Sequence, residues 1–86
     1  MPYIKQGARE RIEPQLKPLE QTELDAGELN YVVFRLGLAY LKRAGLKYLN
    51  LATLIGTLVC CVFELYRRVA TPYEEEKIKQ NGDVIR

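Results

Sequence analysis

Two adjacent arginines with a tyrosine on either side form the most chemically suggestive group in this sequence. Arg67 and Arg68 follow Tyr66 directly and precede Tyr73 by a few residues. A guanidinium group can hold a phosphate or carboxylate through two parallel hydrogen bonds, and a tyrosine ring can stack on a base. These residues could therefore bind an anionic, nucleotide-type small molecule. The interpretation we favour is structural, in which the two arginines form ion pairs inside the fold with the acidic residues Glu20, Glu23, Asp25 and Glu28.

A second basic group lies earlier in the chain and consists of Lys42, Arg43 and Lys47. Along one helix, twenty residues separate Lys47 from Arg67, a distance of about 30 Å. One chain cannot merge the two groups, whereas an antiparallel two-fold dimer could place the first group of one subunit beside Arg67 of the other. A composite anion site at a dimer interface is one hypothesis. The alternative is an ordinary solvated turn with surface lysines, and it is the simpler one.

The sequence contains few residues that could carry out catalysis or bind a metal ion. The chain has no His, which is the commonest metal ligand and the side chain that titrates near neutral pH. Glu64 and Cys61 could act as a base or a nucleophile, but neither has an orienting partner in the sequence. Cys60 and Cys61 are adjacent and resemble small apolar filler rather than a disulfide. We therefore expect no enzyme activity, no metal and no cofactor.

The element that must position these residues is a helix from about Tyr48 to Ala70. Sixteen uncharged residues run from Tyr48 to Phe63. Apolar residues recur at helical spacing and predict one buried stripe: Leu51, Ile55, Leu58, Val62, Leu65 and Val69. Small residues four apart form a second stripe that a neighbouring helix could approach closely: Ala52, Gly56 and Cys60. Because so short a chain cannot cover both stripes, we expect a homo-oligomer, with a dimer as the first expectation and either stripe as its interface.

A second helix is predicted from Glu28 to Arg43, with Gly27 as a permissive start and Gly45 as its end. The connection to Tyr48 is short, and short connections join antiparallel neighbours. The two helices should therefore form an αα-hairpin. In this arrangement the Asn50 amide should serve the hydrogen bonding of the hairpin rather than a ligand.

The two ends of the chain are predicted from their prolines and glycines. Residues 1–8 should be an extended arm, and Pro14 and Pro18 should break the following segment into two short helical pieces. Thr71-Pro72-Tyr73-Glu74 has the pattern of a capping box and predicts a separate short helix that ends at Asn81-Gly82. Residues 83–86 should be a loose tail. The sequence as a whole predicts an all-α single domain over residues 1–86, assembled as a helical bundle.

Charge and hydropathy narrow the partners and the location. The net charge is +2, with four basic and six acidic residues in 1–34, six and one in 35–68, and three and four in 69–86. A net charge this small, with acidic residues in excess at both ends, gives little attraction to a polyanion, so we do not expect nucleic acid as a partner. The uncharged run of sixteen residues is shorter than the roughly 20 that span a bilayer, and the first residues have no apolar core of a signal peptide. We therefore expect a cytoplasmic protein outside the membrane, and unpaired cysteines are typical of that compartment.

The order and spacing of several short blocks resemble a family of small uncharacterised proteins from bacteriophages and bacteria. The blocks are Met1-Pro2-Tyr3-Ile4, Glu28-Leu29-Asn30-Tyr31, Tyr48-Leu49-Asn50, Ile55-Gly56, Glu64-Leu65-Tyr66-Arg67-Arg68, Pro72-Tyr73-Glu74, Lys77 and Asn81-Gly82-Asp83-Val84. The resemblance covers nearly the whole chain and implies a phage or bacterial cytoplasmic setting, with no activity attached.

Three functions fit these observations. The first is a non-catalytic accessory protein that binds a host protein through a helical surface, which requires only exposed apolar and charged patches. The second is a protein that sequesters an anionic nucleotide-type molecule in pockets between subunits. The third is a structural or assembly component.

Overall fold

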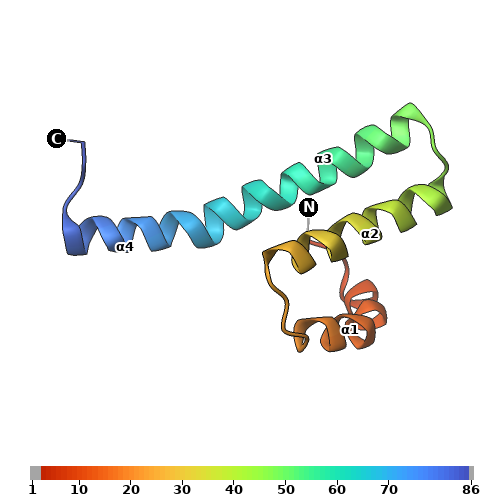
Figure 1. Ribbon diagram of the computed structural model, residues 1–86, viewed down its shortest axis with the longest axis horizontal. Helices are drawn as coiled ribbons and strands as arrows, with labels where there is room; N and C mark the ends of the chain where they lie inside the picture. Colours follow the sequence, from red (N-terminus) through yellow and green to blue (C-terminus); the bar gives the residue numbers. More distant parts are fainter. Residues whose placement is uncertain (1–2, 86) are drawn as a thin grey trace. The chain divides into compact units, whose positions relative to one another are not determined.

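A computed structural model of the protein describes residues 3–85. Its helices are α1 (Gln6–Glu20), α2 (Ala26–Ala44), α3 (Tyr48–Leu65), the π-helical segment η1 (Tyr66–Ala70) and α4 (Thr71–Asn81). Figure 1 labels the four α-helices, and η1 lies between α3 and α4. Residues 3–85 contain no strand, so the predicted all-α class is confirmed. The described residues divide into two units, residues 3–54 and residues 55–85, which are described in turn. The single domain over residues 1–86 stays a prediction.

The first unit begins with a shorter arm and a longer helix than the sequence suggested. The expected arm over residues 1–8 is extended only from Tyr3 to Lys5 within the described residues, since Met1 and Pro2 lie outside them. Helix α1 begins at Gln6, where the amides of Ala8 and Arg9 donate to the Lys5 carbonyl at 3.1 Å. Gly7 is accommodated in the first turn of this helix.

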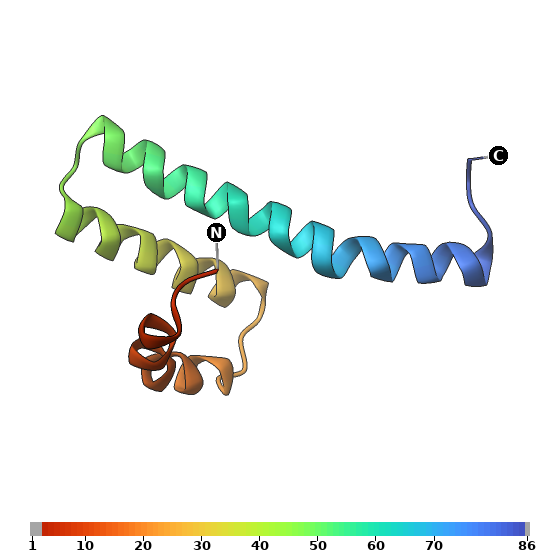
Figure 2. The same ribbon diagram turned by 180° about the vertical axis from the view of Figure 1, so that it is seen from behind.

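The predicted break at the two prolines is wrong, because α1 runs as one helical segment through Pro14 and Pro18. Each proline leaves the carbonyl four residues earlier without its usual amide donor. Those carbonyls belong to Glu10 and to Pro14 itself, and both residues are exposed, so water can replace the lost bonds. The proline φ is compatible with a helix, and the effect is limited to a change of direction along α1, which Figures 1 and 2 both show.

Helix α2 begins at Ala26 rather than at Glu28 because Asp25 forms a complete capping box. The Asp25 carboxylate accepts from the Glu28 amide at 2.8 Å, and the Glu28 carboxylate accepts from the Asp25 amide at 2.9 Å. Two amide donors at the start of the helix are thereby satisfied. The predicted end is confirmed, since Gly45 follows α2 with φ of 106°, a conformation that favours glycine.

The connection between α2 and α3 is organised by Asn50. Its Nδ2 donates to the carbonyls of Ala44 at 3.0 Å and Gly45 at 2.9 Å. Carbonyls at the end of a helix lack an intrahelical donor, and the Asn50 side chain supplies one. The predicted role of Asn50 in hydrogen bonding at this turn is confirmed.

Gly37 and Leu54 bring α2 and the first part of α3 together. Gly37 is the buried residue of α2, and a Cβ atom added to it would lie 3.3 Å from Cδ2 of Leu54. The absence of a side chain at position 37 therefore lets Leu54 approach the helix backbone. This contact lies inside the first unit, and the αα-hairpin as a whole stays a prediction.

In the second unit, the helix continues from α3 through η1 into α4 without the predicted break at Thr71. Ala70 and Thr71 both have helical φ and ψ, and the Thr71 side chain makes no cap. The amide of Thr71 donates to the Tyr66 carbonyl, which is five residues earlier. Pro72 has no amide and its ring would clash with the carbonyl of Arg68 in a regular α-helix, so a wider π turn here relieves the clash. A capping box was predicted, and a π-bulge is found instead.

Helix α4 ends as predicted at Asn81, followed by Gly82 with φ of 84°. The tail from Asp83 to Ile85 is exposed, and its last residue, Arg86, lies outside the described residues.

Among residues 3–85, no hydrophobic side chain is fully buried. The predicted stripe is therefore not covered within the single chain, with Ile55 59%, Val62 60% and Leu65 63% exposed. Val69 falls within η1, where the extra residue in the turn changes the helical register, so the even spacing of the stripe ends at Leu65.

Candidate functional site

The predicted arginine group is built around Glu64. Nη2 of Arg67 lies 2.6 Å from Oε1 of Glu64, three residues earlier on the same helix, and Nη1 of Arg68 lies 4.0 Å from Oε2. The Glu64 side chain is only 13% exposed, whereas that of Arg67 is 68% exposed. A carboxylate that is largely shielded from water needs such partners, because its charge would otherwise be costly.

Glu64 was not among the partners predicted for Arg67 and Arg68, and both interpretations of these arginines stay predictions. The structural interpretation expected their partners among Glu20, Glu23, Asp25 and Glu28, and the ion pairs found in the second unit are made to Glu64. The spacing of three and four residues is the ordinary one for ion pairs along a helix, and it was available in the sequence.

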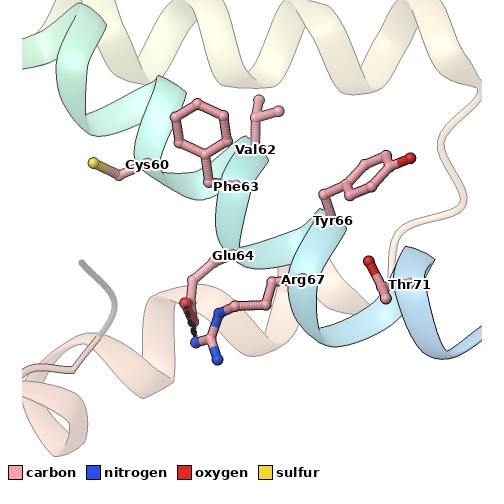
Figure 3. A pocket seen from close by; sticks show the side chains of 7 residues that line it. All are labelled: Cys60, Val62, Phe63, Glu64, Tyr66, Arg67 and Thr71. Carbon is pink, nitrogen blue, oxygen red and sulfur yellow. Dashed lines mark hydrogen bonds and ion pairs between the residues drawn. The ribbon is translucent and has the colours of Figure 1, made fainter.

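An open hollow of about 890 Å³ lies along this part of the helix. It is lined by Cys60, Val62, Phe63, Glu64, Tyr66, Arg67 and Thr71. Figure 3 shows that Glu64 and Arg67 extend together on one side of the helix, whereas Val62 and Tyr66 extend on another. Tyr66 and Arg67 therefore do not converge on one point, although both line the hollow.

The two tyrosines of the predicted group make separate contacts. The Tyr66 hydroxyl donates to Oε1 of Glu74 over 3.4 Å, which is a long hydrogen bond across the π turn. Nζ of Lys77 lies 5.6 Å from the centre of the Tyr73 ring, in the range of a cation–π interaction. Neither Tyr73 nor Arg68 lines the hollow.

The second basic group lies at the turn of the first unit. Lys42 and Arg43 occupy the last turn of α2, where their charge suits the helix dipole, and Lys47 precedes α3. All three are exposed, and within residues 3–85 none of them forms an ion pair.

The two predicted interface stripes are both open to solvent. Ala52 and Gly56 are exposed and Cys60 is half-buried, and an added Cβ on Gly56 would meet no atom within 4 Å. On the apolar stripe, Leu51 is half-buried and Leu58 is 38% exposed. Both stripes are therefore accessible to another molecule.

A further apolar edge on α2 was not singled out from the sequence. Tyr31, Phe34 and Leu38 follow one another at spacings of three and four, and they are 59%, 64% and 47% exposed. The guanidinium carbon of Arg35 lies 5.5 Å from the centre of the Tyr31 ring, and Nη1 of Arg35 donates to the Tyr31 hydroxyl. The spacing was present in the sequence, and the structure adds that these side chains are exposed.

Two further features bear on the kind of site. The described residues contain no group of three or more His, Cys, Asp or Glu side chains able to hold a metal ion.

The helix from Tyr48 to Asn81 is long and apolar enough to cross a membrane by length and composition, and its most apolar part is not buried. One such helix is weak evidence for a membrane location, because core helices of soluble proteins reach the same length and composition, although those helices are mostly buried.

Together these features describe a small all-helical protein with paired charges on one helix and apolar faces left uncovered. The chain belongs to a family described as Domain of unknown function (DUF6899), whose model matches residues 1–84. No curated protein and no solved structure matches the chain.

Proposed function

We propose that the protein is a non-catalytic accessory protein of a bacteriophage or bacterium, which works in the cytoplasm as a helical homo-oligomer and binds a host protein through an apolar helix face. The observation that carries this proposal is the exposure of large apolar side chains on helices whose own chain does not cover them. Exposed apolar patches of this extent are typical of interaction surfaces. The proposal includes the αα-hairpin of α2 and α3 as the unit that assembles.

The edge formed by Tyr31, Phe34 and Leu38 is the surface that we assign to the host protein. Aromatic side chains dominate the energy of protein interfaces, and residues at i, i+3 and i+7 form one line of anchors along a helix. Arg35 stacks on Tyr31 beside this line and adds a charged rim. The edge therefore has the composition of a small binding surface.

Affinity capture from bacterial lysate tests this assignment by comparing two variants. Phe34→Asp places a charge at the centre of the edge and should abolish capture of any host protein bound by the wild type. The control is Leu46→Asp, which makes the same kind of change at a residue that is 80% exposed outside the edge, and it should retain capture. Equal capture by both variants would contradict the assignment.

A second candidate is sequestration of an anionic nucleotide-type molecule. It is supported by two hydrogen-bond donors on the same hollow, Arg67 and Thr71. Glu64 competes with any anion for Arg67, so Glu64→Gln should strengthen binding. A thermal-shift screen with cyclic and linear nucleotides should raise the melting temperature of the wild type and raise that of the variant further. No shift with either protein would remove this candidate.

The remaining alternative, a structural or assembly component, is separated by the same experiments. It predicts self-association, with no host protein captured and no nucleotide-induced shift.

A further inference from the structure

The exposed area of a single chain calls for a large partner surface. On the part of α3 that lies in the second unit, Ile55, Val62 and Leu65 are each between 59% and 63% exposed, and contiguous exposed apolar side chains mark interaction surfaces. The interfaces of obligate dimers are built from apolar side chains of this kind and cover about 2,000–5,000 Å² in total. A second copy of the chain is the occupant that supplies an equally long and equally apolar surface.

The apolar stripe on α3 is the face that extends furthest without a charged residue. Ile55, Leu58, Val62 and Leu65 are between 38% and 63% exposed and alternate at spacings of three and four. This spacing is that of the seam between two long helices packed side by side. The small residues Ala52 and Gly56 lie off this seam, so they do not define it.

The charges along the helix decide the orientation of the two copies. Lys47 precedes α3, Arg67 and Arg68 lie in η1, and the acidic run Glu74–Glu76 lies in α4. In a parallel pair, each of these groups would lie level with the same group on the other copy. Like charges would then face each other, which is unfavourable. An antiparallel pair can instead place Lys47 of one copy close to the acidic run of the other.

We propose that two copies pair antiparallel along the helix from Tyr48 to Asn81, with the two-fold axis near Cys60. Counted by residue number, Lys47 lies level with Tyr73 of the other copy, and the extra residue in η1 brings Glu74 closer to that level. Leu58 lies level with Val62, and Ile55 with Leu65, so the seam residues meet one another. Arg67 and Arg68 lie level with the uncharged residues Thr53 and Ala52. This pairing rests on the homo-oligomer of the proposed function and specifies its orientation.

Cross-linking between two different variants tests the orientation directly. In a background with Cys60→Ser and Cys61→Ser, Lys47→Cys protein is mixed with Glu74→Cys protein and treated with a short bis-maleimide. The two positions are separated by about 40 Å along one helix, so a link between them must join two chains. We expect covalent dimer from the mixture and at least fivefold less from either variant alone.

Each other outcome of this experiment overturns the proposal. Dimer formed by Lys47→Cys protein alone indicates a parallel pair. No dimer from any sample, with helical circular dichroism unchanged, means that the helices do not pair along this length. If the same proteins form no cross-link and instead sediment with anionic lipid vesicles, the apolar face binds a membrane and the proposal is wrong.

A charge exchange provides an independent measurement. Lys47→Glu should weaken self-association at least tenfold, although a negative charge at this position favours the start of α3 through the helix dipole. Adding Glu74→Lys, Glu75→Lys and Glu76→Lys to that variant should restore association. If Lys47→Glu leaves association unchanged, the antiparallel register is wrong.

The outcomes also separate this proposal from the proposed function. If the protein is oligomeric but the cross-link fails, the orientation is wrong while the proposed function stands. If the protein is strictly monomeric, both are wrong.

Discussion

Asn50 links the end of one helix to the start of the next through a single side chain. Its amide donates to two carbonyls that have no donor inside α2. Hydrogen bonds of this kind contribute about 1 kcal/mol each. The Gly45 carbonyl also accepts from the Lys47 amide at 3.0 Å. We therefore expect the Asn50 side chain to contribute measurably to the stability of the turn between α2 and α3.

The first prediction is that Asn50→Ala lowers the free energy of unfolding by about 1–3 kcal/mol. Asn50→Asp should have a similar effect, because a carboxylate has no N–H to donate. The measurement is urea denaturation followed by circular dichroism. The control is Asn30→Ala, at an exposed position of α2, which should change stability by less than about 0.5 kcal/mol. Equal effects at positions 30 and 50 would contradict this role.

At this scale, the sequence predicted the role of Asn50 but not the partner of Arg67. Asn50 follows a glycine-terminated helix by a few residues, and that local pattern restricts what its amide can reach. Arg67 had two sets of acidic residues within plausible reach, one on its own helix and one in the N-terminal part. Within the second unit, Arg67 forms an ion pair with Glu64 at 2.6 Å, and helical spacing was the signal that could have found it.

At the scale of the elements, two similar sequence patterns have different outcomes. Asp25-x-x-Glu28 forms a capping box, whereas Thr71-x-x-Glu74 lies inside a continuous helix. The difference arises from what precedes each pattern. Residues 21–25 are not helical and provide no carbonyl acceptors for the first amides of α2, but residues 66–70 are already helical and supply carbonyls to the next turn.

The second prediction compares these two positions. Asp25→Ala should destabilise the protein by about 0.5–2 kcal/mol, the usual cost of removing an N-cap. Thr71→Ala should be neutral or slightly stabilising, because alanine has the higher helix propensity. Thermal or urea unfolding of both variants provides the comparison. A loss of stability at Thr71 equal to that at Asp25 would mean that α4 begins with a true cap.

Helical periodicity predicted α2 and α3 well, since both carry long apolar patterns and end at glycine or a short turn. The errors lie at the prolines. Pro14 and Pro18 were read as breaks, but their freed carbonyls are exposed and can bond to water. Pro72 was read as the start of a new helix, but a π turn accommodates it. A proline identifies a missing amide donor, and whether the helix ends there depends on the surroundings.

The whole molecule is dominated by apolar surface that the chain does not cover. Residues 3–85 contain no fully buried hydrophobic side chain. Ordering a chain of this length costs far more free energy than such limited burial can offset. We therefore expect the folded state to depend on association, which makes stability a function of protein concentration. The choice between the two stripes of α3 could not be made from the sequence, because both have helical spacing.

The third prediction distinguishes the two stripes. Val62→Glu places a charge on the apolar stripe and should abolish self-association. Gly56→Leu enlarges the stripe of small residues, where an added Cβ meets open space, and should leave association within about twofold of the wild type. Gel filtration at several concentrations measures both. The opposite pattern would assign the interface to Ala52, Gly56 and Cys60.

The fourth prediction concerns concentration. Dilution through the dissociation constant should lower the melting temperature and the helical content together, because the single chain lacks a buried core. Circular dichroism melts over a hundredfold range of concentration provide the test. A melting temperature independent of concentration would show that one chain folds by itself.

The most direct test is the mass of the purified protein in solution, measured by sedimentation equilibrium in buffer without detergent. We predict a mass of at least twice the 9.9 kDa of one chain. A folded species of 9.9 kDa at micromolar concentration, or a protein that stays in solution only with detergent, would contradict the claim that a second copy covers the apolar stripe of α3.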